Sequence, residues 1–237
     1  MFSDAPAYGY RMFKSPVFSL RNVVLVGAAL AAASCASNPS AFVGQKAAWR
    51  DTSERACLTS GGLRQSRFVK PVSQLGGPAV CGALRPFKML AADYGRVTLR
   101  PAAVLRCPMV TTVDDWVRES VASAAARYLG SAVVEMKVAA SYSCRTRNGI
   151  AGGKLSEHGL ANALDVSEFI LADGRKITVK RGWRGASSEQ AFLRAVHRSA
   201  CKRFTTVLGP NADRYHHDHF HVDLARHNKA GTYRVCR

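Results

Sequence analysis

The sequence has few acidic residues, no proline-rich repeat and only one long apolar run without charges. Its 237 residues include 34 Lys and Arg against 16 Asp and Glu, so the formal net charge is +18. A hydrophobic fraction of 47% excludes a wholly disordered chain. The single long apolar run without charges, residues 22–38, excludes a multi-span membrane protein, because each span needs roughly 20 apolar residues. The basic charge favours anionic partners such as nucleic acid, acidic lipid or cell-wall polymer.

Residues 1–34 have the organisation of a signal peptide. Basic residues precede a short apolar core, and small residues follow it. A helix retained in the membrane is the alternative, although the core is short for a span. Residues 30–35 resemble a lipoprotein box, which would attach a lipid anchor to Cys35, and ordinary cleavage near residues 31–33 serves equally well. We therefore predict export to the periplasm or cell envelope, with or without a lipid on Cys35.

The cysteines indicate a disulfide-bonded domain after this leader. Six of the seven cysteines follow Cys35, an even number that can form three disulfides in an oxidising compartment. We expect Cys201 to pair with Cys236, because the two flank a histidine-rich segment. No CxxC pair occurs, which argues against a cysteine zinc cluster. Residues 35–54 are predicted to be a tether, and residues 55–237 to be one compact domain.

Hydrophobic periodicity predicts a mixture of helices and strands. Apolar residues at helical spacing predict a helix over residues 114–129, ended by Gly130. Alternation predicts one strand over residues 133–142 and another over residues 215–224. A capping box at Ser187 predicts the start of a second helix. Because no regular βαβ rhythm occurs, we predict an α+β fold with a small, mostly antiparallel sheet flanked by helices.

Histidines concentrate in residues 215–223, where four of the seven lie within six residues of one another. If this segment is a strand, its side chains alternate between the two faces of the sheet. One face then gathers His217, His219, His221 and Asp223. Three histidines on one face are difficult to explain as core residues and are typical of a metal site. A solvated polar face and fortuitous metal capture remain alternatives.

A second segment, residues 156–165, supplies further ligand types. His158 and Asp165 stand too far apart for one face of a helix within two turns. They converge if His158 lies in a loop leading into the strand that carries Asp165. Catalytic zinc sites use three such protein ligands and keep one position open for water. His197 and His227 lie outside both segments and are expected at the surface.

The two segments together resemble a known family of zinc enzymes. Ser156, His158, Ala163 and Asp165 match the SxHxxGxAxD motif of the D-Ala-D-Ala metallopeptidases. His219-Phe220-His221 matches the second motif of these enzymes, HxH. Residues 55–237 as a whole are similar to the bacterial extensin-like C-terminal family. This resemblance implies a hedgehog- and D-Ala-D-Ala-peptidase-like fold with His158, Asp165 and His221 as zinc ligands. Ala161 replaces the glycine of the motif, and alanine adopts positive φ only with strain.

The resemblance also implies roles for neighbouring residues. Asp218, three residues before His221, takes the position of the acid that activates the attacking water. His219 and Arg145 would stabilise the developing oxyanion, and His216 would orient a ligand through a hydrogen bond. Because strict alternation turns Asp218 away from His219 and His221, this assignment requires a bend in the strand just before Asp218.

These features together predict an exported zinc peptidase that hydrolyses peptidoglycan stem peptides or their cross-links. Peptidoglycan is anionic, which fits the basic charge of the chain. A catalytically inactive module of the same fold that binds cell-wall peptides is the alternative. Nucleic acid is not an expected partner, because the basic residues are dispersed and form no long Lys/Arg run. The sequence leaves open which peptide bond is cleaved and what the oligomeric state is.

Overall fold

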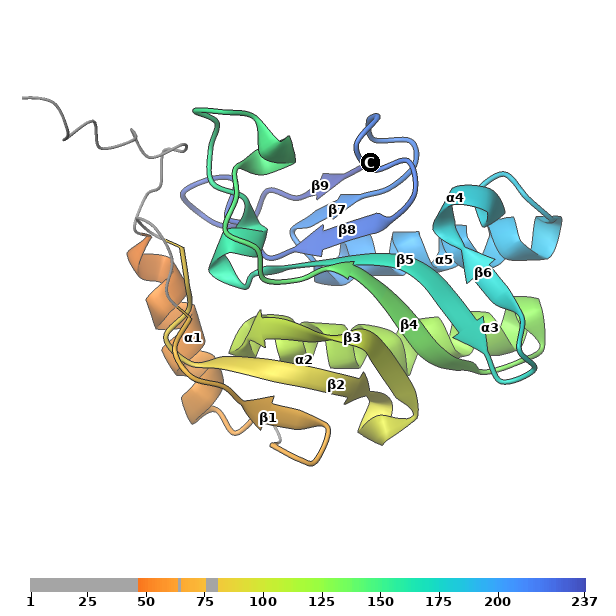
Figure 1. Cartoon of the computed structure of the whole chain (residues 1–237), viewed down its shortest axis with the longest axis horizontal. Coiled ribbons are helices and arrows are strands. Elements are labelled where there is room, and N and C mark those ends of the chain that lie inside the picture. Colours follow the sequence, from red (N-terminus) through yellow and green to blue (C-terminus); the bar gives the residue numbers. More distant parts are fainter. Residues whose placement is uncertain (1–46, 64, 76–80) are drawn as a thin grey trace, which may run out of the picture. The chain divides into compact units, whose positions relative to one another are not determined.

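Nine strands and several helices make up the part of the chain that the structure describes (Figure 1). This structure is a computed structural model, and it describes residues 47–63, 65–75 and 81–237. The predicted signal peptide and Cys35 lie outside these residues. The α+β class and the mostly antiparallel pairing are confirmed, but the sheet is larger than predicted and includes two parallel pairs of strands. Across the described ranges, no helix has the length and apolarity needed to cross a membrane.

The strands are shortest at the edges of the sheet. In chain order they are β1 (Val69–Pro71), β2 (Pro86–Ala92), β3 (Val97–Arg106), β4 (Val133–Ala140), β5 (Ala163–Leu171), β6 (Lys176–Thr178), β7 (Thr206–Leu208), β8 (Phe220–Asp223) and β9 (Val235–Cys236). Their order across the sheet is β1-β2-β3-β4-β5-β8-β7-β9. Neighbouring strands are antiparallel except for β3–β4 and β7–β9. The first half of β5 pairs with β8 and its second half pairs with β6.

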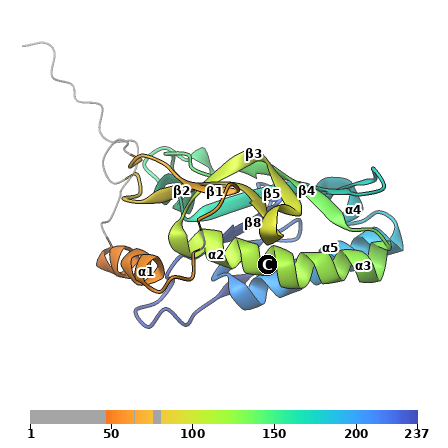
Figure 2. The same cartoon turned by 90° about the horizontal axis from the view of Figure 1, so that it is seen from below.

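Helices cover one face of this sheet. The helices of the described residues are α1 (Ala48–Thr59), α2 (Cys107–Trp116), α3 (Ala122–Leu129), α4 (Val179–Gly182) and α5 (Ser187–Arg203), with a π-helical segment η2 (Val117–Val121) and 3₁₀ turns η1 (Asp93–Gly95), η3 (Arg147–Gly149) and η4 (Glu157–Leu160). Figure 2 shows α2, α3 and α5 lying along the same face. Fully buried aromatic rings fill the space between them and the sheet. Trp116 meets Phe204 edge-on with the ring centroids 5.8 Å apart.

The helical segment formed by α2, η2 and α3 begins earlier than predicted. It starts at Cys107 rather than at Asp114, and Gly130 ends it in the left-handed conformation, as predicted. Pro108 in the first turn is the start signal, since proline fits the first helical position. The Asp114 carboxylate instead accepts a hydrogen bond from the backbone N–H of Asp93 at 2.8 Å.

Part of the predicted tether is helical. Residues 48–54 form the first turns of α1. The Glu54 side chain is buried and lies 3.4 Å from the Arg106 guanidinium. Cys57, farther along the same helix, forms a disulfide with Cys107. These long-range contacts hold α1 against β3 and α2, and the spacing of residues along the sequence does not reveal them.

Three disulfides join the six described cysteines, as predicted: Cys57–Cys107, Cys81–Cys144 and Cys201–Cys236. The last is the pair expected from the sequence. Cys81 and Cys144 pack with Leu155 and Leu160 in a small apolar cluster. This disulfide therefore joins the segment before β2 to the loop after β4, and the η4 turn that leads into β5 packs against it.

The predicted strand over residues 215–224 is mostly a loop. β8 starts only at Phe220, and turns precede it. The Asp213 carboxylate accepts hydrogen bonds from the backbone N–H of Tyr215 at 2.8 Å and from His216 Nδ1 at 2.7 Å. Such local side-chain bonds compete with strand pairing and favour a turn. Strand alternation therefore applies only from Phe220 onward.

Candidate functional site

Two neighbouring strands and the turn before one of them bring three polar side chains together. Asp165 of β5 stands directly opposite His221 of β8 in the antiparallel register. Directly opposite residues have Cβ atoms about 4.5–5.5 Å apart, so this register places an imidazole against a carboxylate. The η4 turn, which leads the chain into β5, adds His158. We call His158, Asp165 and His221 the ligand cluster.

The facing atoms of the ligand cluster are close enough to bind one cation. Asp165 Oδ1 lies 2.8 Å from His221 Nδ1, and Asp165 Oδ2 lies 3.1 Å from His158 Nε2. The two ring nitrogens are 3.3 Å apart. All three ligand atoms lie within 4.8 Å of one another, and their residues are almost completely buried. This spacing suits a metal ion with nitrogen and oxygen ligands at about 2.0–2.2 Å.

Hydrogen bonds on the far side of each ring fix which nitrogen faces the other ligands. His158 Nδ1 donates to the Ser141 carbonyl oxygen at 2.6 Å, and His221 Nε2 donates to Asp223 Oδ2 at 3.0 Å. A carbonyl or carboxylate oxygen only accepts, so these nitrogens carry the protons. The nitrogens that face Asp165 therefore have free lone pairs when the rings are neutral. Metal-binding histidines almost always make this outer hydrogen bond.

The carboxylates around His221 strongly favour a positive charge on or beside its ring. Burial lowers the pKa of His221, but hydrogen bonds to Asp165 and Asp223 outweigh burial and raise the pKa to about 10. Burial raises the pKa of Asp165, yet hydrogen bonds from His158 and His221 hold it far below its usual range. A proton on His221 or a metal cation within the cluster can supply this positive charge. The two compete for the same lone pair.

The turn before β5 has an unusual backbone at Ala161. This residue has φ 51° and ψ 30°, in the left-handed region that glycine adopts without strain. Its N–H donates to the His158 carbonyl oxygen at 3.1 Å, and its own carbonyl oxygen accepts from the Arg106 N–H at 2.9 Å. Ala161 thus takes the positive φ expected where the motif has glycine, and these contacts maintain the strain.

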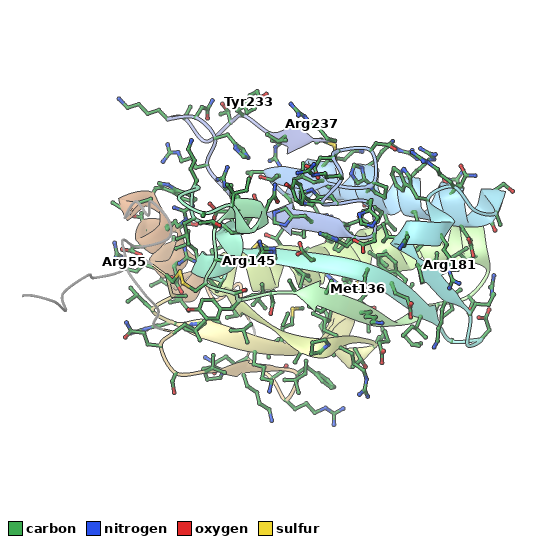
Figure 3. The ribbon with its side chains drawn as sticks, turned by 45° about the horizontal axis from the view of Figure 1, so that its top comes forward. Arg55, Met136, Arg145, Arg181, Tyr233 and Arg237 are labelled. Atoms are coloured by element: carbon green, nitrogen blue, oxygen red, sulfur yellow. A yellow bond between two sulfur atoms is a disulfide. The ribbon has the colours of Figure 1, made fainter. Side chains whose placement is uncertain are left out.

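A cavity of about 470 Å³ opens beside the ligand cluster. Arg145 and Arg147 from the loop after β4 line it, together with Tyr215 and His219 from the loop before β8. Figure 3 labels Arg145 among the side chains of this region. The volume lies within the range of small-ligand sites, about 300–1,000 Å³. The loop after β4 therefore contributes cationic side chains to the cavity wall, and the loop before β8 contributes aromatic and imidazole rings.

Asp218 contacts His219 rather than the ligand cluster. Its Oδ1 lies 2.9 Å from His219 Nδ1, and the side chain is half-exposed. The His219 ring holds the pKa of the Asp218 carboxyl below its usual range. His219 turns its Nε2 toward the cluster, 3.7 Å from Asp165 Oδ2. The chain does bend before β8, but the bend directs Asp218 to His219.

His216 is buried beside the site. Its ring packs against those of His219 and His221, with centroids 5.3 Å and 5.7 Å away. Burial lowers the pKa of His216, and the Asp213 carboxylate, 2.7 Å from Nδ1, opposes this shift. His216 therefore supports the neighbouring imidazoles by packing, with Asp213 holding its own ring in place.

Asp223 and Ser141 contribute to the site in ways that the sequence did not predict. The sequence places Asp223 on the histidine face but gives it no role. The available signal was its spacing of two residues from His221, which puts both side chains on the same face of β8. Ser141 carries no signal, because its backbone carbonyl makes the contact.

A second group of potential ligands is closed to metal. His197, Cys201 and Cys236 also have ligand atoms within 4.8 Å of one another. Both cysteines are joined in a disulfide, so neither offers a thiolate. Within the described part of the chain, the ligand cluster is therefore the group whose donor atoms remain available.

The prediction that His197 lies at the surface is wrong. Its ring is buried between Trp183 and Phe220, with centroids 5.6 Å and 5.4 Å away. His197 Nε2 donates to the Arg237 carbonyl oxygen at 3.0 Å, a contact with the distant C-terminal residue that spacing in the sequence does not indicate. Burial lowers the pKa of His197. His227 is exposed, as predicted.

The site lies within a region that a protein family shares. No curated protein and no solved structure matches the chain. Residues 55–237 match the family described as extensin-like protein C-terminus. The match includes the whole ligand cluster and well over half of the chain, whereas the first turns of α1 precede it. The chain therefore belongs to the extensin-like protein C-terminus family.

Proposed function

We propose that this protein is an exported zinc metallopeptidase that hydrolyses peptidoglycan stem peptides or their cross-links in the periplasm or cell envelope. The observation that carries the proposal is the convergence of His158, Asp165 and His221, with the outer nitrogen of each imidazole already hydrogen-bonded. Two imidazoles and one carboxylate beside a cavity form a ligand set used by zinc hydrolases, which keep a fourth position for water.

The donor atoms fit zinc in type and number. When bound, zinc lowers the pKa of a coordinated water to about 7 and polarises a carbonyl group. Ser141 and Asp223 hold the two imidazoles in the required tautomers, so the lone pairs need no reorganisation. Burial of Asp165 limits competition from bulk water for its carboxylate oxygens.

His219 is well placed to move protons during hydrolysis. Its Nε2 accepts a proton from the attacking water and delivers it to the amine nitrogen of the leaving peptide. Asp218, on Nδ1, holds the ring in the tautomer whose Nε2 is unprotonated, and it stabilises the ring when both nitrogens are protonated. Asp218 thus acts through His219, which differs from the direct role that the family resemblance implies.

Arg145 provides a group that can orient the peptide. Arg145 lines the cavity, and a guanidinium there can bind a carboxylate or carbonyl oxygen of the substrate. Arg147, exposed two residues later, adds positive charge to the same wall. Stem peptides carry free carboxylates, which these groups attract. The net charge of +18 also favours approach to the anionic cell wall.

A second candidate function is a module that binds cell-wall peptides without cleaving them. The observation that favours it is the position of the Asp218 carboxylate, which is half-exposed and contacts His219 instead of the ligand cluster. This arrangement leaves proton transfer to His219 alone.

Incubation of the purified protein with peptidoglycan fragments distinguishes the two functions. We expect new fragments, detected by mass, that disappear with a chelator and return with added zinc. Release of a single residue would indicate a carboxypeptidase, and separation of two peptides would indicate an endopeptidase. Zinc-dependent binding without any new fragment would support the second candidate and contradict the first.

A further inference from the structure

A second cluster of buried charges lies next to the turn that carries His158. It consists of Arg50 and Glu54 from α1, Arg106 from the end of β3 and Glu157 from η4, and we call it the arginine cluster. Arg50 pairs with Glu157, and Arg106 lies 3.4 Å from the Glu54 carboxylate. Each buried carboxylate thus faces one guanidinium, and the four charges cancel.

Glu157 connects the arginine cluster to the ligand His158, its neighbour in the chain. Glu157 Oε2 accepts a hydrogen bond from Asn162 Nδ2 at 2.7 Å, and the Glu157 carbonyl oxygen accepts one from the Asn162 N–H at 3.0 Å. Both bonds close the turn that carries His158 and leads into β5. The orientation of Glu157 therefore sets the position of His158 relative to Asp165.

Arg50 is the group that allows the Glu157 carboxylate to be buried. The Glu157 side chain is only 5% exposed, and a buried carboxylate requires a partner of opposite charge. Arg106, the other guanidinium of the cluster, already faces Glu54. Without Arg50, the Glu157 carboxylate would lose the charged partner that holds it in place. The loss of this partner would loosen its hydrogen bond to Asn162.

α1 is attached firmly enough to transmit this effect. The disulfide between Cys57 and Cys107 joins the helix to α2, and Glu54 joins it to β3 through Arg106. Arg50 nevertheless precedes residue 55, where the family match begins. The turn that carries His158 is thus completed by a residue from outside the family region.

We infer that Arg50 is a positioning residue for the ligand His158, and that the functional unit begins with α1 rather than at residue 55. Arg50 acts through Glu157, which in turn orders the η4 turn. The inference rests on the proposed function, because it concerns the geometry of the metal site. It goes beyond that function by assigning a role to a segment that the family match does not include.

Zinc affinity of the Arg50→Gln protein tests this inference. Outer groups that orient metal ligands typically change affinity 10–100-fold, and for this more distant group we expect a loss of about 10-fold. The cobalt(II)-substituted variant should also show an altered visible spectrum, because that spectrum reports ligand geometry. Arg50→Lys keeps the charge, so it should recover part of the zinc affinity and part of the wild-type spectrum. The matched control is Arg55→Gln, an exposed arginine on the same helix (Figure 3), which should behave as wild type.

Affinity and spectrum equal to wild type in Arg50→Gln would overturn the inference. If this variant does not fold, Arg50→Lys provides the same comparison. The double variant Arg50→Gln/Glu157→Gln removes the charge that Arg50 neutralises, so it should bind zinc more tightly than Arg50→Gln alone. Equal or weaker binding by the double variant would also overturn the inference. A wild-type protein that binds no zinc would overturn the proposed function itself, so the two failures are distinguishable.

Discussion

The arginine cluster and the ligand cluster meet at the η4 turn, and they differ in the kind of positive charge that they contain. In the arginine cluster, each carboxylate is neutralised by a guanidinium of the same chain. In the ligand cluster, the Asp165 carboxylate faces two imidazoles, and Asp223 lies behind one of them. Both clusters are buried, but only the second contains cationic groups that can lose their charge.

This difference determines which of the two clusters can bind a cation. Guanidinium groups stay protonated and have no lone pair to offer, so the arginine cluster cannot bind a cation. A neutral imidazole does offer a lone pair. The neighbouring carboxylates raise the pKa of His221 to about 10, so this cluster favours a bound positive charge. A buried histidine–carboxylate group with an incomplete charge balance is therefore the stronger indication of function.

The largest expected effect comes from breaking the ligand cluster at His221. His221→Ala should weaken zinc binding by more than about 100-fold, because even outer partners of ligands change affinity 10–100-fold. Peptide cleavage should be lost with the zinc. His217→Ala is the matched control, since this exposed histidine lies four residues earlier in the same segment. Zinc titration of both variants is the measurement, and wild-type affinity in His221→Ala would remove His221 from the ligand set.

A comparison of His219 with Asp218 sharpens the assignment of proton transfer. His219→Ala should lower kcat by about 10²–10⁴ while zinc stays bound, because it removes the group that carries the proton. Asp218→Asn should lower kcat by a smaller factor. The double variant should have the same kcat as His219→Ala, because the two residues act as one unit. Steady-state kinetics on a defined stem peptide gives these values. A larger loss in Asp218→Asn than in His219→Ala would return the base role to Asp218.

The outer carboxylate of the ligand cluster should have an intermediate effect. Asp223→Asn replaces the charged acceptor of His221 Nε2 with an amide, and zinc affinity should fall about 10–100-fold. Competition with a chelator of known affinity measures this change. Asp173→Asn, an exposed carboxylate paired with Arg175, is the control and should leave zinc affinity unchanged. Equal affinities in the two variants would show that Asp223 has no influence on the metal.

The disulfides should give the smallest effects on zinc. Replacement of Cys81 and Cys144 by serine, or of Cys201 and Cys236, should each lower the free energy of unfolding by about 2–4 kcal/mol. Only the first pair packs beside the turn that carries His158, so only its loss should also weaken zinc binding, by a few-fold. Thermal unfolding and zinc titration of both double variants test this. The comparison fails if the second pair weakens zinc binding as much as the first.

The sequence predicted the features that depend on local pattern. The strand β4 and the helix α5 follow from periodicity, and their predicted starts at Val133 and Ser187 are confirmed. The three residues of the ligand cluster were implied by the family resemblance, and the β5–β8 register and a short turn bring them together. Gly130 ends its helix by the left-handed conformation expected of it. For the strand, the helix and the helix end, the physical cause lies within a few residues of the pattern, whereas the ligand cluster also needs the pairing of β5 with β8.

The features that the sequence did not predict depend on distant partners. The turns of α1 before residue 55 are stabilised by Arg106 and Glu157, which follow much later in the chain. The capping box expected at Ser187 does not form, because Ser187 is already the first helical residue and Gln190 bonds the Gly185 carbonyl oxygen instead. Residues before Phe220 alternate like a strand, yet local hydrogen bonds hold them in turns. The pattern of apolar and polar residues does not indicate which of these competing contacts is the more stable.

Anomalous scattering from crystals grown with zinc tests the central claim most directly. Data collected at the zinc absorption edge should give a peak bounded by His158 Nε2, the Asp165 carboxylate and His221 Nδ1, at about 2.0–2.2 Å from each ligand atom. The same crystals treated with a chelator should lose this peak. Zinc-loaded crystals with no peak at the ligand cluster, or with their strongest peak elsewhere in the molecule, would contradict the account.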